Sequence, residues 1–177
     1  KDTPIMAVKK AGIIGSGTMG GGIAMCFANA SIPVHIIDQD ADNLKRGLSV
    51  IEKNYDFMVN KGRMTAEQKD MVFGLITSSL DYKDLHDVDI AIEAVYENLD
   101  LKLEIFKSLD EHVQNNAILA SNTSGLDVDA IASVTNRPNK VVGTHFFSPA
   151  NIMRLLEVVR GEQTSHETLA TVMNKVR

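Results

Sequence analysis

The sequence predicts an α/β fold in which helices cover both faces of a doubly wound, mostly parallel sheet. Three observations lead to this prediction. Short runs that are apolar throughout alternate with longer amphipathic stretches, as expected for buried parallel strands joined by helices. The chain has 177 residues, a length that suits one main domain with a full core. Apolar residues make up 44% of it and charges of both signs are scattered along it, as in an ordinary globular protein.

In the first half of the chain, apolar runs at 11–15 and 33–38 predict two strands, and the stretch between them predicts a helix at 18–30. Two amphipathic stretches follow the second strand, at 41–60 and 65–75. The charged segment that joins them is typical of a turn between exposed helices. The sequence therefore predicts a helical arm after the second strand.

In the second half, the same alternation continues to the end of the chain. Strands are expected at 89–95, 117–122, 141–147 and 155–159. Helices are expected at 99–112, 128–134 and 165–177. The last strand has the sequence LLEVV, with Glu157 between two apolar pairs, so we expect this strand to be buried.

Both ends of the sequence have the character of cut ends of a longer chain. Residues 1–9 are polar, contain a proline and show no periodicity, so they are predicted to be the end of a linker from a preceding region. The closing helix reaches residue 177 without a glycine or proline stop signal. We therefore expect one α/β domain over residues 10–177.

Composition argues against several classes of function. The net charge of −5 argues against a nucleic-acid-binding surface. No apolar run reaches the roughly 18 residues that a membrane span needs, and none has the pattern of a secretory signal. The single cysteine allows no internal disulfide, and the histidines lack metal-ligand spacing, so no metal site is predicted. A bacterial cytoplasm is the expected compartment, with a peroxisome or a mitochondrion as alternatives.

A glycine motif lies between the first predicted strand and the first predicted helix. Gly15, Gly17 and Gly20 form the pattern G-x-G-x-x-G, and Asp38 ends the second strand eighteen residues later. The first glycine permits a tight turn, the second lets the backbone approach a pyrophosphate, and the third lets helix and strand pack closely. Free N–H groups at the start of the helix then meet the phosphates. This order predicts a dinucleotide site, whereas the alternative is a glycine-rich turn that binds nothing.

Asp38 indicates which dinucleotide is bound. A carboxylate at this position accepts hydrogen bonds from the hydroxyls of the adenosine ribose and repels a 2′-phosphate. No arginine immediately follows it, so NAD is predicted rather than NADP. FAD uses the same fingerprint, and the glycines alone therefore leave the reaction open.

Three polar side chains beyond the glycine motif indicate a reaction. Ser124 and His145 each follow or close a predicted strand, so both are expected at the carboxyl edge of the sheet, over which ligands bind. Glu157 is costly in a buried strand without a partner, and His145 is the economical partner. A carboxylate that holds one imidazole nitrogen fixes the tautomer and aims the other nitrogen.

This pair has the chemistry that a dehydrogenase needs. Oxidation of an alcohol removes its hydroxyl proton while hydride leaves the same carbon, so a base must reach the oxygen. His145 is the candidate base, and Ser124 can hold the oxygen as both donor and acceptor. The alternatives are a structural histidine and a serine that caps a turn or helix.

The sequence from about residue 9 to 177 resembles the NAD-binding domain of the L-3-hydroxyacyl-CoA dehydrogenases of fatty-acid β-oxidation. The segments that carry the resemblance are GSGTMGGGIA, EAVYEN, SNTSGL and GTHFFSP, in the family's order and spacing. The form HFFSPA, where many members have HFFNP, is more similar to multifunctional enzymes in which an enoyl-CoA hydratase/isomerase precedes the dehydrogenase. The resemblance implies a Rossmann-type fold, NAD as cofactor and an acyl-CoA thioester as substrate.

The same resemblance implies roles for particular residues. His145 is the general base, Glu157 is its partner and Ser124 contacts the substrate hydroxyl. The implied cofactor-binding residues are Gly15, Gly17, Thr18, Met19, Gly20, Asp38, Glu97, Lys102 and Asn122. The family's C-terminal helical domain completes the acyl-CoA site, contributes a catalytic asparagine and often carries the dimer contact, and we expect it to be absent from this chain. We therefore expect a cofactor-binding part of a multidomain enzyme that can form oligomers.

Two other functions stay open. A regulatory dinucleotide-binding module needs no buried base, and a dehydrogenase for a free hydroxyacid has a similar G-x-G-T-M-G start. The latter enzymes generally place a catalytic lysine in a later helix and lack SNTS together with HFF. Glu97 and Lys102 also have an alternative interpretation, as an exposed ion pair at the start of a helix.

Overall fold

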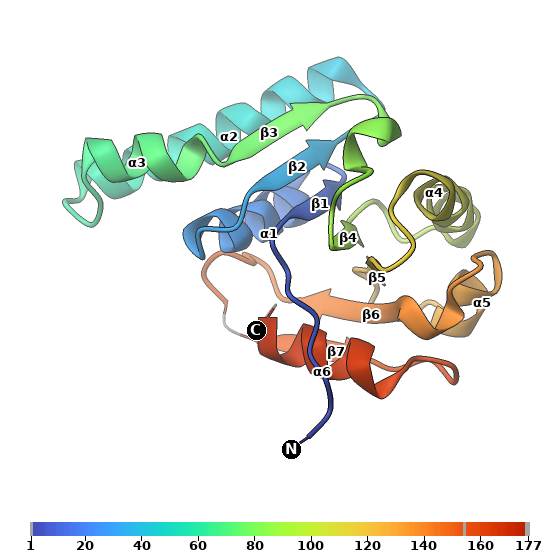
Figure 1. The fold of residues 1–177 in the computed structure, drawn as a ribbon. Helices are drawn as coiled ribbons and strands as arrows, with labels where there is room; N and C mark the ends of the chain where they lie inside the picture. Colours follow the sequence, from blue (N-terminus) through green and yellow to red (C-terminus); the bar gives the residue numbers. More distant parts are fainter. Residues whose placement is uncertain (1, 154, 176–177) are drawn as a thin grey trace.

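The fold is a seven-stranded sheet with helices on both faces (Figure 1). The computed structural model describes residues 2–153 and 155–175. The strands have the spatial order β3-β2-β1-β4-β5-β6-β7. Neighbouring strands pair in parallel, except that β6 and β7 are antiparallel. The predicted doubly wound, mostly parallel α/β fold is confirmed.

The elements agree closely with the predicted ones. The strands are β1 (Ala11–Ile14), β2 (Val34–Ile37), β3 (Ile76–Ser79), β4 (Ile90–Glu93), β5 (Ile118–Ser121), β6 (Val141–Phe146) and β7 (Leu156–Val159). The helices are α1 (Thr18–Asn29), α2 (Ala41–Asn60), α3 (Ala66–Phe73), α4 (Leu99–His112), α5 (Val128–Ser133) and α6 (His166–Lys175), with short 3₁₀ turns η1 (Tyr82–Leu85) and η2 (Pro138–Lys140). Within the described residues, no helix is long and apolar enough to cross a membrane.

Strand β3 was not predicted, because only one of its four residues, Ile76, is strongly apolar. It pairs with β2 at the edge of the sheet, where full burial is not required. Two of its three hydroxyl groups have a partner on β2, since the ring nitrogens of His35 lie 2.6 Å from Thr77 Oγ1 and 2.9 Å from Ser79 Oγ.

The core consists of two layers, one on each side of the sheet, because successive strand residues face opposite sides. Ile13 and Ile92 belong to the layer that packs against α1, α2 and α6. Ile14 and Leu119 belong to the layer that packs against α4 and α5. Figure 1 shows α2 and α3 extending together beyond the sheet, so the predicted helical arm is present.

The segment before the first strand lies against the domain. The amide of Met6 donates to Thr171 Oγ1 on α6 at 2.9 Å. The amides of Lys9 and Lys10 both donate to Asp89 Oδ2, at 2.7 and 3.1 Å. Part of the segment expected as a linker thus makes specific contacts with the α/β domain.

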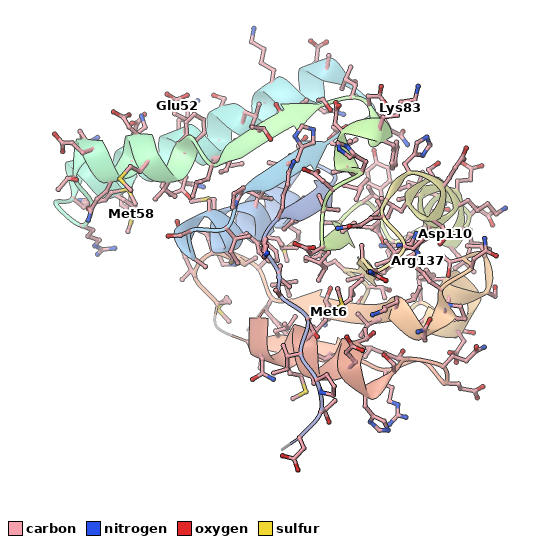
Figure 2. All side chains as sticks on the ribbon, viewed as in Figure 1. Met6, Glu52, Met58, Lys83, Asp110 and Arg137 are labelled. Carbon is pink, nitrogen blue, oxygen red and sulfur yellow. The ribbon has the colours of Figure 1, made fainter. Side chains whose placement is uncertain are left out.

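Arg137, labelled in Figure 2 beside Asp110, holds together the region after α4. Its Nε donates to Asp110 Oδ1 at 2.8 Å. Its Nη atoms donate to the backbone carbonyls of Asp110, Val113, Gln114 and Ala117. The guanidinium therefore supplies donors to backbone carbonyls at the end of the helix and just beyond it.

Candidate active site

The glycine turn between β1 and α1 is formed by three glycines with different physical roles. Gly15 has a φ of +104°, a conformation that favours glycine. A Cβ on Gly20 would lie 1.9 Å from the carbonyl oxygen of Gly15, so this glycine is required for helix and turn to pack. A Cβ on Gly17 would meet no atom within 4 Å, so its backbone faces open space.

That space belongs to a cavity of about 1020 Å³ over the carboxyl ends of β1, β2 and β4. Five predicted cofactor-binding residues line it: Gly15, Gly17, Thr18, Met19 and Asp38. The cavity lies where the strand order reverses, which is the ligand position in open α/β sheets. Its volume, the open face of Gly17 and the start of α1 fit a dinucleotide.

Asp38, which follows β2, is held in place by Ser16. The Ser16 amide and hydroxyl both donate to Asp38 Oδ2, at 3.0 and 2.6 Å. Burial alone raises the pKa of the Asp38 carboxyl, but the hydrogen bonds from Ser16, Asp40 and Gln39 outweigh it and hold this pKa below its ordinary value. The carboxylate is therefore ionised at neutral pH. Sequence reasoning did not select Ser16, although it occupies the variable position between the first two motif glycines.

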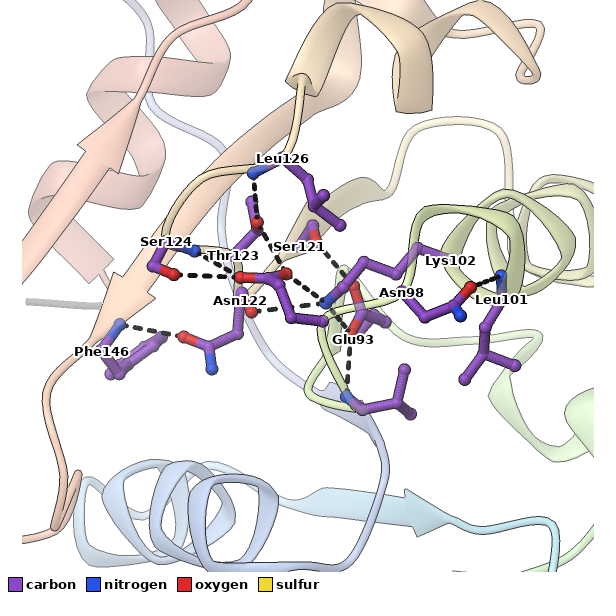
Figure 3. Close-up of polar contacts among 12 residues, drawn as sticks. Glu93, Asn98, Leu101, Lys102, Ser121, Asn122, Thr123, Ser124, Leu126 and Phe146 are labelled. Atoms are coloured by element: carbon purple, nitrogen blue, oxygen red, sulfur yellow. Dashed lines mark hydrogen bonds and ion pairs between the residues drawn. The ribbon is translucent and has the colours of Figure 1, made fainter.

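A buried ion pair lies beside the cavity, at the carboxyl end of β4 (Figure 3). Lys102 Nζ on α4 is 2.6 Å from Glu93 Oε2, and both side chains are 0% exposed. Glu93 also accepts hydrogen bonds from Ser121 Oγ at 2.6 Å and from the Val95 amide at 2.8 Å. Burial raises the pKa of Glu93, and Lys102 and these donors oppose the rise. Sequence reasoning missed Glu93, although it is a carboxylate at the end of an apolar strand.

Glu97 connects this pair to the loop after β5. Its Oε2 accepts hydrogen bonds from the amide and hydroxyl of Ser124, at 2.9 and 3.0 Å, and its Oε1 accepts one from Thr123 Oγ1 at 2.9 Å. Lys102 Nζ lies 3.5 Å from Glu97 Oε1. Burial raises the pKa of Glu97, but the Ser124 and Thr123 donors together with Lys102 lower it by more, so this pKa is below its ordinary value.

The buried position of Lys102 corrects one alternative, because an exposed Glu97–Lys102 pair is not what the structure contains. The Lys102 ammonium points at Glu93, and its side chain supports Glu97 from the protein interior. Asn122 also has a supporting contact: its Oδ1 accepts a hydrogen bond from the Phe146 amide at 3.0 Å. That bond joins the Ser124 loop to β6 next to His145.

His145 and Glu157 are direct partners across the β6–β7 pair. His145 Nδ1 lies 3.3 Å from Glu157 Oε2, as predicted from their chemistry. The expectation that Glu157 lies in a buried strand is wrong. Strand β7 is an antiparallel edge strand, and the Glu157 side chain is 57% exposed. The His145 ring packs against Phe147, with 4.7 Å between ring centroids.

Among the described residues, no group of three or more potential ligand side chains could hold a metal ion.

Comparisons with known proteins identify relatives over nearly the whole chain. A family model described as "3-hydroxyacyl-CoA dehydrogenase, NAD binding domain" matches residues 10–177. The human peroxisomal bifunctional enzyme is 46% identical over 171 residues, which cover 94% of this chain and 23% of that protein. The 3-hydroxybutyryl-CoA dehydrogenase of Clostridioides difficile is 40% identical over 163 residues, which cover 92% of this chain and 58% of that protein.

A solved structure gives the same result. The crystal structure of (S)-3-hydroxybutyryl-CoA dehydrogenase from Ralstonia eutropha has a TM-score of 0.93 and 38% identity, covering 96% of this chain and 60% of that one. The chain spans less than two thirds of each of these three relatives. The family match covers all of the described sheet and the cavity above it. The chain therefore belongs to the family of 3-hydroxyacyl-CoA dehydrogenase NAD-binding domains.

Proposed function

We propose that this chain is the NAD-binding domain of an enzyme that oxidises an L-3-hydroxyacyl-CoA thioester to the 3-oxoacyl-CoA. The observation that carries the proposal is the His145–Glu157 pair, which supplies an oriented base at the carboxyl end of β6. The names of the relatives, which include 3-hydroxybutyryl-CoA dehydrogenases, support this substrate class. A regulatory module would have no use for such a base.

In the proposed reaction, His145 takes the proton of the substrate hydroxyl at Nε2. Glu157 holds Nδ1–H, which fixes the tautomer and stabilises the imidazolium that forms. Ser124 Oγ lies 3.0 Å from Glu97 Oε2, and its hydroxyl can turn to donate to the substrate oxygen, whose own proton goes to His145. NAD, when bound in the cavity, supplies the acceptor for the hydride.

Glu97, Lys102 and Asn122 have a common task in this proposal. All three hold the loop that carries Ser124. Lys102 contacts Glu97, and Glu97 accepts a hydrogen bond from the Ser124 amide. Asn122 accepts a hydrogen bond from the Phe146 amide and so joins the loop to β6. Glu97 is partly exposed and can also meet the nicotinamide half of the cofactor, whereas Lys102 acts from the interior. The site is thus positioned by groups that precede and follow the loop.

The domain arrangement is part of the proposal. Residues 10–177 form the NAD-binding domain, and the residues before them lead from a preceding region. A helical domain of the whole enzyme completes the acyl-CoA site and carries contacts between subunits. The named relatives include bacterial and peroxisomal proteins, and the proposed reaction is the same in both settings.

A chimera tests the proposed reaction. The chain would replace the matching region of the C. difficile relative, and reduction of acetoacetyl-CoA would be followed by loss of NADH absorbance. We expect turnover that falls by at least about a hundredfold in His145→Ala, because general-base catalysis contributes about 10²- to 10⁴-fold. NADH binding, measured by fluorescence titration, is expected to stay within about twofold, because His145 holds a proton rather than the cofactor.

The matched control is His86→Gln, which changes an exposed histidine on the opposite end of the sheet. Equal activity of the chimera and its His145→Ala variant would reject the proposed base. Activity on a free 3-hydroxyacid but not on its thioester would instead support a dehydrogenase of a different substrate class.

A further inference from the structure

Helix α2 touches the glycine turn at a point outside the G-x-G-x-x-G motif. Gly47 is buried in the second turn of α2. A Cβ added there would lie 2.3 Å from the carbonyl oxygen of Ser16 and 2.8 Å from its Cβ. Because the nearer atom belongs to the backbone, any larger residue must displace the turn itself.

Ser16 is enclosed between this helix and Asp38. Its side chain is buried, at 4% exposed. Its hydroxyl and amide both donate to Oδ2 of Asp38, and the hydroxyl also lies 3.2 Å from the carbonyl oxygen of Asn43 on α2. Helix α2 therefore packs directly against the glycine turn, and the turn donates to one oxygen of the Asp38 carboxylate.

This restraint matters because of what else lines the cavity. Arg46, next to Gly47 on α2, lines the same cavity as Asp38. A guanidinium is a good partner for a phosphate. If the Asp38 carboxylate turned away, it would repel a 2′-phosphate less, and the Arg46 guanidinium would be left to attract that phosphate. The choice of cofactor thus depends on how firmly the Asp38 carboxylate is held.

We propose that Ser16 and Gly47 are specificity-determining residues, which hold the Asp38 carboxylate in the one orientation that accepts ribose hydroxyls and repels a 2′-phosphate. Ser16 supplies both donors to Oδ2, whereas the Asp40 amide donates to Oδ1 at 3.2 Å. Gly47 supplies the space in which Ser16 can approach Asp38. The inference rests on the cavity being the NAD site and is independent of the proposed dehydrogenase chemistry.

The test is a pair of titrations of the 177-residue chain with NADH and with NADPH. We expect the dissociation constant for NADPH divided by that for NADH to fall by about tenfold in Ser16→Ala. This change corresponds to about 1.4 kcal/mol, which is close to the size of a hydrogen bond to a charged group. Gly47→Ala is expected to lower the ratio in the same direction. In an Asp38→Ala background, neither change is expected to alter the ratio further, because the restrained group is gone.

Ser49→Ala is the control, since it changes an exposed residue of the same helix. A second measurement is an NMR titration of the Asp38 carboxyl. Its pKa is expected to rise in Ser16→Ala, because the hydroxyl donor is lost. If Gly47→Ala does not fold, Ser16→Ala alone decides the question. Equal weakening of NADH and NADPH binding by Ser16→Ala, with no change in the ratio, would overturn the proposal.

The outcomes also separate this inference from the proposed reaction. A folded chain that binds neither dinucleotide overturns the role of Ser16 and Gly47 as specificity residues. Selective NADH binding that Ser16→Ala relaxes, in a chain whose chimera shows no turnover, supports the inference and rejects only the proposed reaction.

Discussion

Loss of the Lys102 ammonium is expected to destabilise the chain by about 3 kcal/mol. Removal of one partner from a buried ion pair costs about 3–5 kcal/mol, because the other charge stays buried without compensation. The structure points to the lower end of this range. Glu93 keeps its hydrogen bonds from Ser121 and Val95, and its pKa, already raised by burial, rises further without Lys102. The carboxyl can therefore take up a proton, which limits the cost.

The assay is urea denaturation of the Lys102→Met variant, followed by circular dichroism because the chain has no tryptophan. The double variant Glu93→Gln/Lys102→Met removes both charges and leaves an acceptor for Ser121 and Val95. We expect it to recover more than half of the lost free energy of unfolding. Lys107→Met, on the exposed side of the same helix, is expected to change stability by less than about 0.5 kcal/mol. A loss below about 1 kcal/mol in Lys102→Met would refute the reasoning, since it would place the measured cost in the range of an exposed pair.

Two further predictions concern stability away from the cavity. Arg137→Leu leaves Asp110 without its partner and removes a donor from four backbone carbonyls, of which that of Gln114 keeps the Ala117 amide, so urea denaturation should show a loss of about 3 kcal/mol or more. Arg137→Lys should recover only part of this stability, because an ammonium cannot replace the guanidinium fork. Burial lowers the pKa of His35 below its ordinary 6.5, so stability should be full above about pH 6.5 and fall as pH drops through the folded-state pKa. The slope should be at most about 1.4 kcal/mol per pH unit, and His35→Gln should flatten it; an unchanged profile in His35→Gln would contradict the assignment.

Most of the fold could be predicted because a parallel sheet covered on both faces leaves a strong signal in the sequence. Each central strand must be apolar on both sides, and each connection must be an amphipathic helix. Strand β3 was not predicted, because an edge strand need not be apolar on both sides. Its Thr77 and Ser79 hydroxyls contact His35 instead. The predicted bounds of α2 and α4 match the structure, whereas most other predicted elements extend one or two residues too far at one or both ends, since capping depends on local geometry. The predicted end of the last helix, at residue 177, lies outside the described residues.

The site was predictable where its residues are close in the sequence. The glycine turn and Asp38 form a short βαβ unit whose spacing follows from backbone geometry alone. The supports of the Ser124 loop come from the segment between β4 and α4, from α4, from the residue after β5 and from β6, and their contacts depend on how these elements pack. Sequence reasoning could name Glu97 and Lys102 only through resemblance, and it could not show that Lys102 faces Glu93.

Glu93 and Glu157 show why position within the sheet decides what a carboxylate can do. Both lie in short apolar strands, so the same reasoning from cost assigns each of them a partner. Glu93 ends a central strand, is wholly buried and requires a permanent cation, which Lys102 supplies. Glu157 lies on the antiparallel edge strand, where solvent stabilises its charge whether or not His145 is protonated. An exposed carboxylate suits the proposed base, because its charge stays solvated while the imidazole is neutral. The position of β7 at the antiparallel edge of the sheet therefore suits the His145–Glu157 pair to the proposed proton transfer. The central position of β4 suits the Glu93–Lys102 pair to structural support.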